Sequence, residues 1–154
     1  MFRITRRSLL LAGLAATAGR SLRAETLPRI YVAKDATCPC CSAWVDYLLA
    51  DGFPVIVTVL EAEPLDALKT ERGIPGEARS CHTAFVDGYF LEGHVPVADV
   101  QRLLAERPDG LGLAVPGMPF GSPGMGPESE AEAYDVLLVG RDGSLTVFSS
   151  YPAA

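Results

Sequence analysis

Four cysteines are the residues of this sequence best suited to chemistry. Three of them, Cys38, Cys40 and Cys41, lie within four positions, and the fourth is Cys81. Three cysteines so close together cannot all form structural disulfides with the single cysteine that remains, and adjacent cysteines rarely pair with each other. A purely structural role therefore explains the pattern poorly.

The surroundings of this cysteine segment favour reactive sulfur. It follows an expected strand and begins an expected helix, where Cys38 would be the N-cap and Pro39 the first helical residue. A helix N-terminus stabilises thiolates, which both disulfide exchange and soft-metal binding require. Cys38 and Cys41 also have the C-x-x-C spacing of thioredoxin-like redox sites. Metal binding, dithiol redox chemistry and a structural disulfide all remain open on spacing alone.

Imidazole and thioether groups could complete a metal site. His82 directly follows Cys81, and thiolates with an imidazole suit Cu(I), with Zn(II) as the less favoured metal. His94 precedes an expected helix, so capping or hydrogen bonding explains it as well as ligation does. Met118 and Met125 lie in a Gly- and Pro-rich loop, and thioethers prefer Cu(I), although a single Met more often fills a core.

Hydrophobic periodicity and turn residues predict an α/β fold. The expected order β-α-β-α-β-β-α matches a thioredoxin-like arrangement. The first two strands should both be buried, because they are rich in apolar and β-branched residues. The expected elements are strands at 29–34 and 54–60 with a helix between them, a helix at 64–72, a hairpin of 83–86 and 89–91, and a helix at 96–106.

The rest of the chain predicts an extension of this domain. Residues 108–127 include six Gly and five Pro, so regular structure is improbable and a functional loop is expected. Two runs beyond it, 134–139 and 145–148, flank Asp142-Gly143 and predict a C-terminal hairpin. The predicted organisation is a signal peptide at 1–24, a thioredoxin-like domain at 25–107, and a Gly/Pro/Met loop with a hairpin extension at 108–154.

The amino terminus has the layout of an export signal. A short basic segment precedes an apolar run, and the pair Arg6-Arg7 resembles a twin-arginine signal. The run is too short to span a membrane, so we expect cleavage near Ala24 and a soluble protein in the periplasm, where cysteines meet an oxidising environment.

Charge and length narrow the classes of partner. Residues 25–154 carry eight Lys and Arg against 19 Asp and Glu, a balance that repels phosphate backbones and anionic lipid. We therefore expect no nucleic-acid partner and no membrane association after the signal is removed. The length of 154 residues fits a single domain of ordinary size, and a monomer is the default.

Several short motifs together resemble a bacterial family of exported proteins, the CopG-type copper-resistance proteins, which are unrelated to the DNA-binding repressor of that name. The resemblance extends from about Ile30 to Tyr151. The motifs are Cys38-Pro39-Cys40-Cys41-x-x-Trp44, Ser80-Cys81-His82-Thr83-Ala84, Glu92-Gly93-His94-Val95-Pro96, Leu113-Ala114-Val115-Pro116-Gly117-Met118-Pro119 and Gly121-Ser122-Pro123-Gly124-Met125.

This resemblance implies a thioredoxin-like domain with a carboxyl-terminal extension that holds several copper ions bridged by cysteines. The bridging residues would be Cys38, Cys40, Cys41 and Cys81, with His82 as a further ligand. Met118, Met125 and His94 match family motifs, and we include them among the candidate copper ligands. Members of the family are proposed to change the oxidation state of copper in the periplasm.

Two rival functions remain beside a copper oxidoreductase. A binding-only chaperone or buffer would hold copper and pass it to another periplasmic copper-handling or electron-transfer protein. A metal-independent thiol-disulfide oxidoreductase would work through Cys38 and Cys41. Cys40 counts against that last alternative, because it offers a competing disulfide partner.

Overall fold

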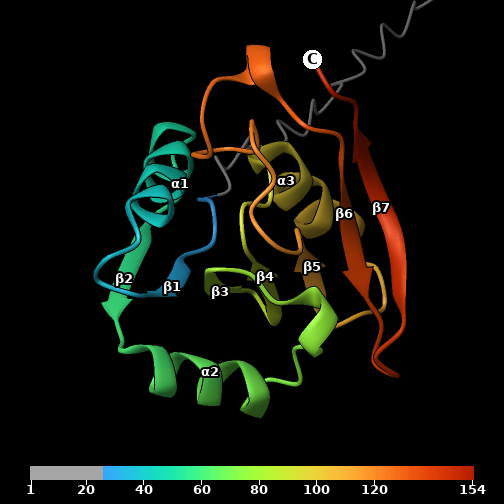
Figure 1. Cartoon of the computed structure of the whole chain (residues 1–154). Helices are drawn as coiled ribbons and strands as arrows, with labels where there is room; N and C mark the ends of the chain where they lie inside the picture. Colours follow the sequence, from blue (N-terminus) through green and yellow to red (C-terminus); the bar gives the residue numbers. More distant parts are fainter. Residues whose placement is uncertain (1–25) are drawn as a thin grey trace, which may run out of the picture.

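A computed structural model of the chain describes residues 26–154 (Figure 1). The expected signal peptide, with its paired arginines and the cleavage site near Ala24, lies outside the described residues. Within 26–154, no helix is both long enough and apolar enough to cross a membrane.

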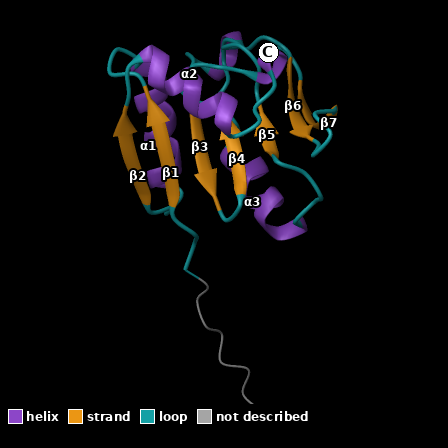
Figure 2. Cartoon of the chain, turned by 90° about the horizontal axis from the view of Figure 1, so that it is seen from below, coloured by secondary structure: helices purple, strands orange, loops and turns teal. Residues whose placement is uncertain are grey.

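A seven-stranded mixed sheet forms the centre of the fold, in the order β2-β1-β3-β4-β5-β6-β7 (Figure 2). The pairs β1–β2 and β4–β5 are parallel, and the other neighbouring strands are antiparallel. The strands are β1 (Ile30–Lys34), β2 (Val55–Val59), β3 (His82–Val86), β4 (Tyr89–Glu92), β5 (Gly112–Ala114), β6 (Tyr134–Val139) and β7 (Leu145–Tyr151).

Three α-helices of residues 26–154 complete the described fold, with α1 and α3 on one side of the sheet and α2 on the other (Figure 1). Elements β1 to α3 follow one another in the predicted order, which confirms the α/β class and is consistent with a thioredoxin-like arrangement. The helices are α1 (Pro39–Ala50), α2 (Ala62–Glu71) and α3 (Val97–Glu106), and 3₁₀ turns occur at Gly76–Ala78 and Glu128–Glu130.

The main core lies between the sheet and the pair α1 and α3. Trp44 and Leu48 of α1 are fully buried there, as are Val100 and Leu103 of α3. A smaller apolar cluster that includes Ile74 is separate from this main core. Burial of these side chains is the main force that fixes α1, and with it the cysteine segment, against the sheet.

The prediction of two buried strands is correct for β1 and wrong for β2. The side chains of Ile56, Val57 and Val59 are 43%, 42% and 55% exposed. The reason is the position of β2 at the edge of the sheet, where one side has no neighbouring strand. A run of β-branched residues indicates a strand but does not tell a central strand from an edge strand.

The expectation that 108–127 lacks regular structure is also wrong in part, because β5 lies within it. The high glycine content of this segment predicts a loop, but Gly112 has a different role. A Cβ at this position would overlap the carbonyl oxygen of Phe90 on β4. Glycine here permits close backbone approach and does not mark a turn. Through β5, the predicted hairpin of β6 and β7 joins the same sheet as the rest of the fold.

We predict that Gly112→Ala destabilises the protein by about 1–3 kcal/mol, because the added methyl group forces β4 and β5 apart. Gly76→Ala is the matched control, since a Cβ there meets no atom within 4 Å. Denaturant unfolding followed by circular dichroism measures both free energies. Equal stability of the two variants would contradict the role assigned to Gly112.

Candidate metal centre

The amino terminus of α1 places three of the four sulfur atoms. Cys38 is the N-cap residue, and its Sγ accepts a hydrogen bond from the backbone N–H of Cys41 at 3.3 Å. Pro39 lies in the first turn, where its missing N–H costs nothing. The predicted cap is therefore confirmed, and the positive end of the helix dipole faces the sulfur atoms.

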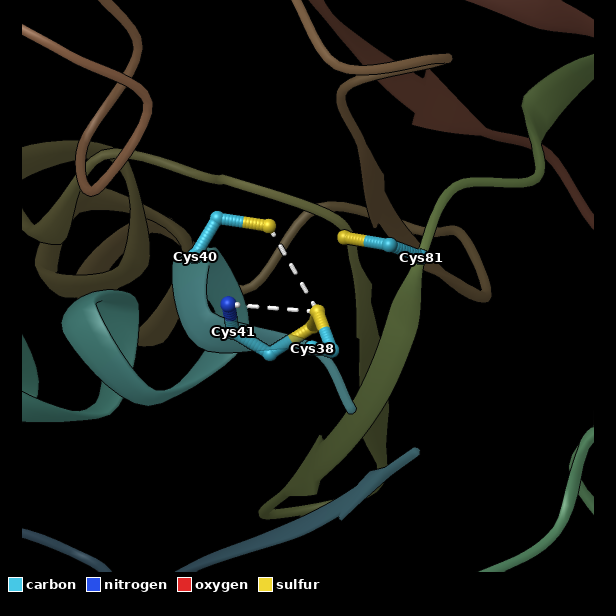
Figure 3. A group of neighbouring side chains, drawn as sticks. All are labelled: Cys38, Cys40, Cys41 and Cys81. Atoms are coloured by element: carbon cyan, nitrogen blue, oxygen red, sulfur yellow. Dashed lines mark hydrogen bonds between the residues drawn. A yellow bond between two sulfur atoms is a disulfide. The ribbon is translucent and has the colours of Figure 1, made fainter. Parts of the chain in front are cut away.

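The four cysteines converge at this end of the sheet. Cys38 and Cys41 form a disulfide, whereas Cys40 and Cys81 are free thiols. The Sγ atoms of Cys38 and Cys40 lie 3.5 Å apart. All four Sγ atoms lie within 4.8 Å of one another, and Figure 3 shows Cys81 pointing toward the start of α1.

Cys81 also belongs to a second group of donors. Its Sγ lies 3.3 Å from Nδ1 of His82 and 3.2 Å from Nε2 of His94. Both imidazoles are completely buried. The sulfur of Cys81 therefore belongs to two groups. One group is the four cysteine sulfurs, and the other is the Cys81 sulfur with one nitrogen from each histidine.

A hydrogen bond to the Gly/Pro/Met loop sets the tautomer of His94. Its Nδ1 lies 2.8 Å from the carbonyl oxygen of Pro123, so this nitrogen must carry the proton that it donates. Nε2 is then unprotonated in the neutral ring and directs its lone pair toward Cys81. Histidines that bind metals commonly have this arrangement, in which the second nitrogen donates to a carbonyl group.

His82 is held by packing. Its ring lies 4.5 Å from the ring of Trp44, whose indole N–H donates to the carbonyl of Val95 at 2.8 Å. Burial lowers the pKa of His82 well below its usual value, and His94, Lys69 and Lys34 lower it further by charge repulsion. Burial also lowers the pKa of His94, which opposes the raising effect of the Pro123 carbonyl. Both rings are therefore neutral, the form that binds metals.

Cys81 is a protonated thiol in the metal-free protein. Burial and then the neighbouring Cys40 raise the pKa of Cys81 to about 11. A bound cation would reverse this preference, because coordination removes the proton from a thiol. The free energy of metal binding at Cys81 therefore includes the release of one proton near neutral pH.

A buried ion pair fixes the backbone beside Cys81. The ammonium of Lys69 lies 2.6 Å from Oε1 of Glu92 and donates to the carbonyl of Ser80 at 2.6 Å. The N–H of Ser80 donates to the same carboxylate oxygen at 2.7 Å. Both charged side chains are buried, so this pair holds the Ser80 peptide on two sides. The sequence alone does not predict this pair, although Lys69 follows Leu65 by four positions on the buried face of α2.

The loop that contains the two methionines crosses the start of α1. A Cβ at Gly124 would lie 2.9 Å from the carbonyl oxygen of Cys40 and 2.9 Å from the backbone nitrogen of Trp44. The backbone next to Met125 therefore touches the cysteine segment. Met118 is 53% exposed, whereas Met125 is half-buried. Ligation by either methionine stays a prediction.

Known proteins with this architecture share much of the sequence. Two solved structures, named "Copper resistance protein copG- Form 2" and "Copper resistance protein copG- Form 1", are 45% and 44% identical to this chain, with TM-scores of 0.75 and 0.77. Each match covers 82% of this chain and 99% of the solved chain. The chain belongs to the CopG copper-resistance family. Residues 78–125 also match the family described as "Protein of unknown function, DUF411", and no curated protein matches the chain.

The donor set of this CopG family member fits a soft metal ion. Four sulfur atoms and two neutral imidazoles make up the two groups, and neither group contains a carboxylate. Soft thiolates with imidazoles suit copper, and carboxylates are the ligands that hard cations prefer. Of the residues predicted as ligands, the structure brings together the four cysteines, His82 and His94.

We predict that the reduced, metal-free protein loses stability as the pH falls below about 6.5. The pKa values of His82 and His94 are lower in the folded chain, so the unfolded chain binds more protons and acid favours unfolding. Each histidine can contribute a slope of up to about 1.4 kcal/mol per pH unit. Denaturant unfolding between pH 7.5 and about 5.5 should give a shallower slope for a double His82→Gln, His94→Gln variant. Identical slopes would contradict the prediction.

Proposed function

We propose that this protein binds copper in the periplasm through a cluster of thiolates and imidazoles and protects the cell from excess copper. The observation that carries the proposal is the convergence of two donor groups on the single sulfur of Cys81. The names of the two related structures support copper as the metal.

Cysteine-bridged copper is the arrangement that this geometry supports. Four sulfur atoms within 4.8 Å of one another are close enough for one thiolate to contact two ions. Sharing spreads negative charge over several Cu(I) ions, which prefer soft thiolate ligands. Several ions are therefore proposed, with Cys38, Cys40, Cys41 and Cys81 as bridging ligands. Zn(II) is the less favoured metal, because the two related structures are named for copper resistance.

Copper loading requires the reduced form of the protein. The disulfide between Cys38 and Cys41 leaves two of the four sulfur atoms unable to act as thiolates. A dithiol reductant would supply two electrons and two protons and become a disulfide itself, which leaves Cys38 and Cys41 as thiols that lose their protons when copper binds. Cys40 and Cys81 keep free thiols in both forms.

The second donor group supports a change in copper valence. Cys81, His82 and His94 supply one sulfur and two nitrogen ligands, a set that accommodates Cu(II) better than thiolates alone do. In the proposed reaction, one Cu(I) loses one electron to an acceptor such as a periplasmic electron-transfer protein and becomes Cu(II). The reverse step takes one electron from a donor of the same class. Burial of both histidines keeps bulk water away from this ion.

The disulfide favours one alternative function, metal-independent thiol exchange. Cys38 is the N-cap of α1, where a thiolate is stabilised, and it pairs with Cys41 at thioredoxin-like spacing. Cys40 weakens this alternative, because its sulfur lies 3.5 Å from that of Cys38 and can compete for it.

Two serine variants separate the functions. We predict that Cys40→Ser loses at least about half of the bound Cu(I), because one bridging thiolate is gone, and keeps the Cys38–Cys41 disulfide. Cys38→Ser should lose both copper and disulfide exchange, while its hydroxyl still caps α1. Metal analysis of protein purified without oxygen, after growth with copper, measures the first property, and reduction of insulin measures the second. A metal-free wild type that reduces insulin would establish thiol exchange instead.

A second prediction addresses valence. Copper-loaded protein treated with ferricyanide should develop the electron paramagnetic resonance signal of Cu(II), retain its copper after gel filtration, and lose the signal when ascorbate is added. His94→Gln should reduce the Cu(II) signal several-fold, because one nitrogen ligand is absent. Release of copper in proportion to its oxidation would show that the protein is a Cu(I) buffer or chaperone only.

A further inference from the structure

Lys34, at the end of β1, is a buried cation beside the cysteine segment. Its side chain is 8% exposed. The ammonium donates to the carbonyl of Asp35 at 2.9 Å and lies 3.5 Å from the carbonyl oxygen of Cys38. Lys34 also pairs with His82 in the register of β1 and β3. The charge therefore lies beside the backbone of Cys38, and the backbone of Lys34 pairs with the strand that follows Cys81.

The other cations around the site have carboxylate partners. Lys69 is paired with Glu92, and Arg79 is paired with Asp66. Within residues 26–154, no carboxylate oxygen lies within 4.0 Å of the Lys34 ammonium.

The neighbouring Asp35 does not neutralise Lys34 by direct contact. Its carboxylate accepts hydrogen bonds from the N–H and the hydroxyl of Thr37, at 2.7 and 2.6 Å. The neutral imidazoles of His82 and His94 add no charge at the site. A lysine this buried with no carboxylate partner can stabilise an anion that forms beside it.

We propose that Lys34 supplies the countercharge for the copper–thiolate cluster; this inference rests on the proposed function and adds an electrostatic residue to it. Four thiolates carry a net negative charge until four Cu(I) ions have bound. A cation beside the Cys38 backbone stabilises the thiolates that receive the first ions. It also opposes further positive charge on copper, so it favours Cu(I) over Cu(II). Lys34 acts through the cluster's charge and is not itself a ligand.

Three variants test this role. Lys34→Gln keeps a hydrogen-bond donor and removes the charge, Lys34→Arg keeps the charge, and Arg141→Gln removes one exposed charge that is paired with Asp109 far along the chain. Competition with a chromophoric Cu(I) chelator measures affinity for the first equivalents of copper. Denaturant unfolding of the reduced, metal-free proteins measures stability.

Lys34→Gln should lower the affinity for the first Cu(I) ions about tenfold, and Lys34→Arg should restore it to within about threefold of wild type. In a redox buffer at fixed potential, the ratio of Cu(II) to Cu(I) should rise several-fold in Lys34→Gln alone. The metal-free Lys34→Gln protein should be at least as stable as wild type, because a buried unpaired charge has been removed. Arg141→Gln should change none of these quantities.

A large loss of stability in metal-free Lys34→Gln would show that Lys34 holds the backbone, and it would overturn the proposal. Tight copper binding by wild type with the same affinity and the same valence ratio in Lys34→Gln would overturn this inference and leave the proposed function intact. A wild type that binds no Cu(I) would overturn both.

Discussion

The pairing of β1 with β3 is the constraint on which the rest of the site depends. These strands are antiparallel, so the last residue of β1 lies beside the first residue of β3, at one end of the two strands. The cysteine-rich turn follows β1, and Cys81 precedes β3, so a single register brings both sulfur-bearing segments together. Packing of Trp44 and Leu48 against the sheet then fixes the direction of α1 and of its capping sulfur.

Burial sets the charge of Cys81, His82 and His94. It keeps both histidines neutral and holds the proton on Cys81, so the metal-free site is polar but carries little charge on its donor atoms. Thiolates and imidazoles without carboxylates are ligands that soft cations prefer, and a cation that binds a thiol displaces its proton. The ion pair of Lys69 and Glu92 keeps the Ser80 peptide in place whether or not a metal is present.

Much of this could be predicted from the sequence because the signals are local. The cap at Cys38, the hairpin of β3 and β4 and the order of elements up to α3 follow from spacing within a few residues. The misassigned features depend on partners distant in sequence. The sequence does not show that Gly112 lies against the carbonyl of Phe90, so composition assigns this glycine to an irregular loop. The composition of β2 is that of a central strand, and only the structure shows that it has a neighbour on one side alone. Lys34 and Lys69 have charges that suggest solvent exposure, and only the tertiary structure shows their burial.

The hydrogen bond between His94 and Pro123 has a consequence for protein design. His94 precedes α3, whereas Pro123 comes from the chain that leads from β5 toward β6. The extension thus acts on the site without having to contribute a ligand, by choosing which imidazole nitrogen is free. Grafting the cysteine and histidine positions onto a shorter thioredoxin scaffold would transfer the donor atoms but leave that nitrogen unspecified. A functional transplant would need the Gly/Pro/Met loop as well, including Gly124, which lets this loop pack against the start of α1.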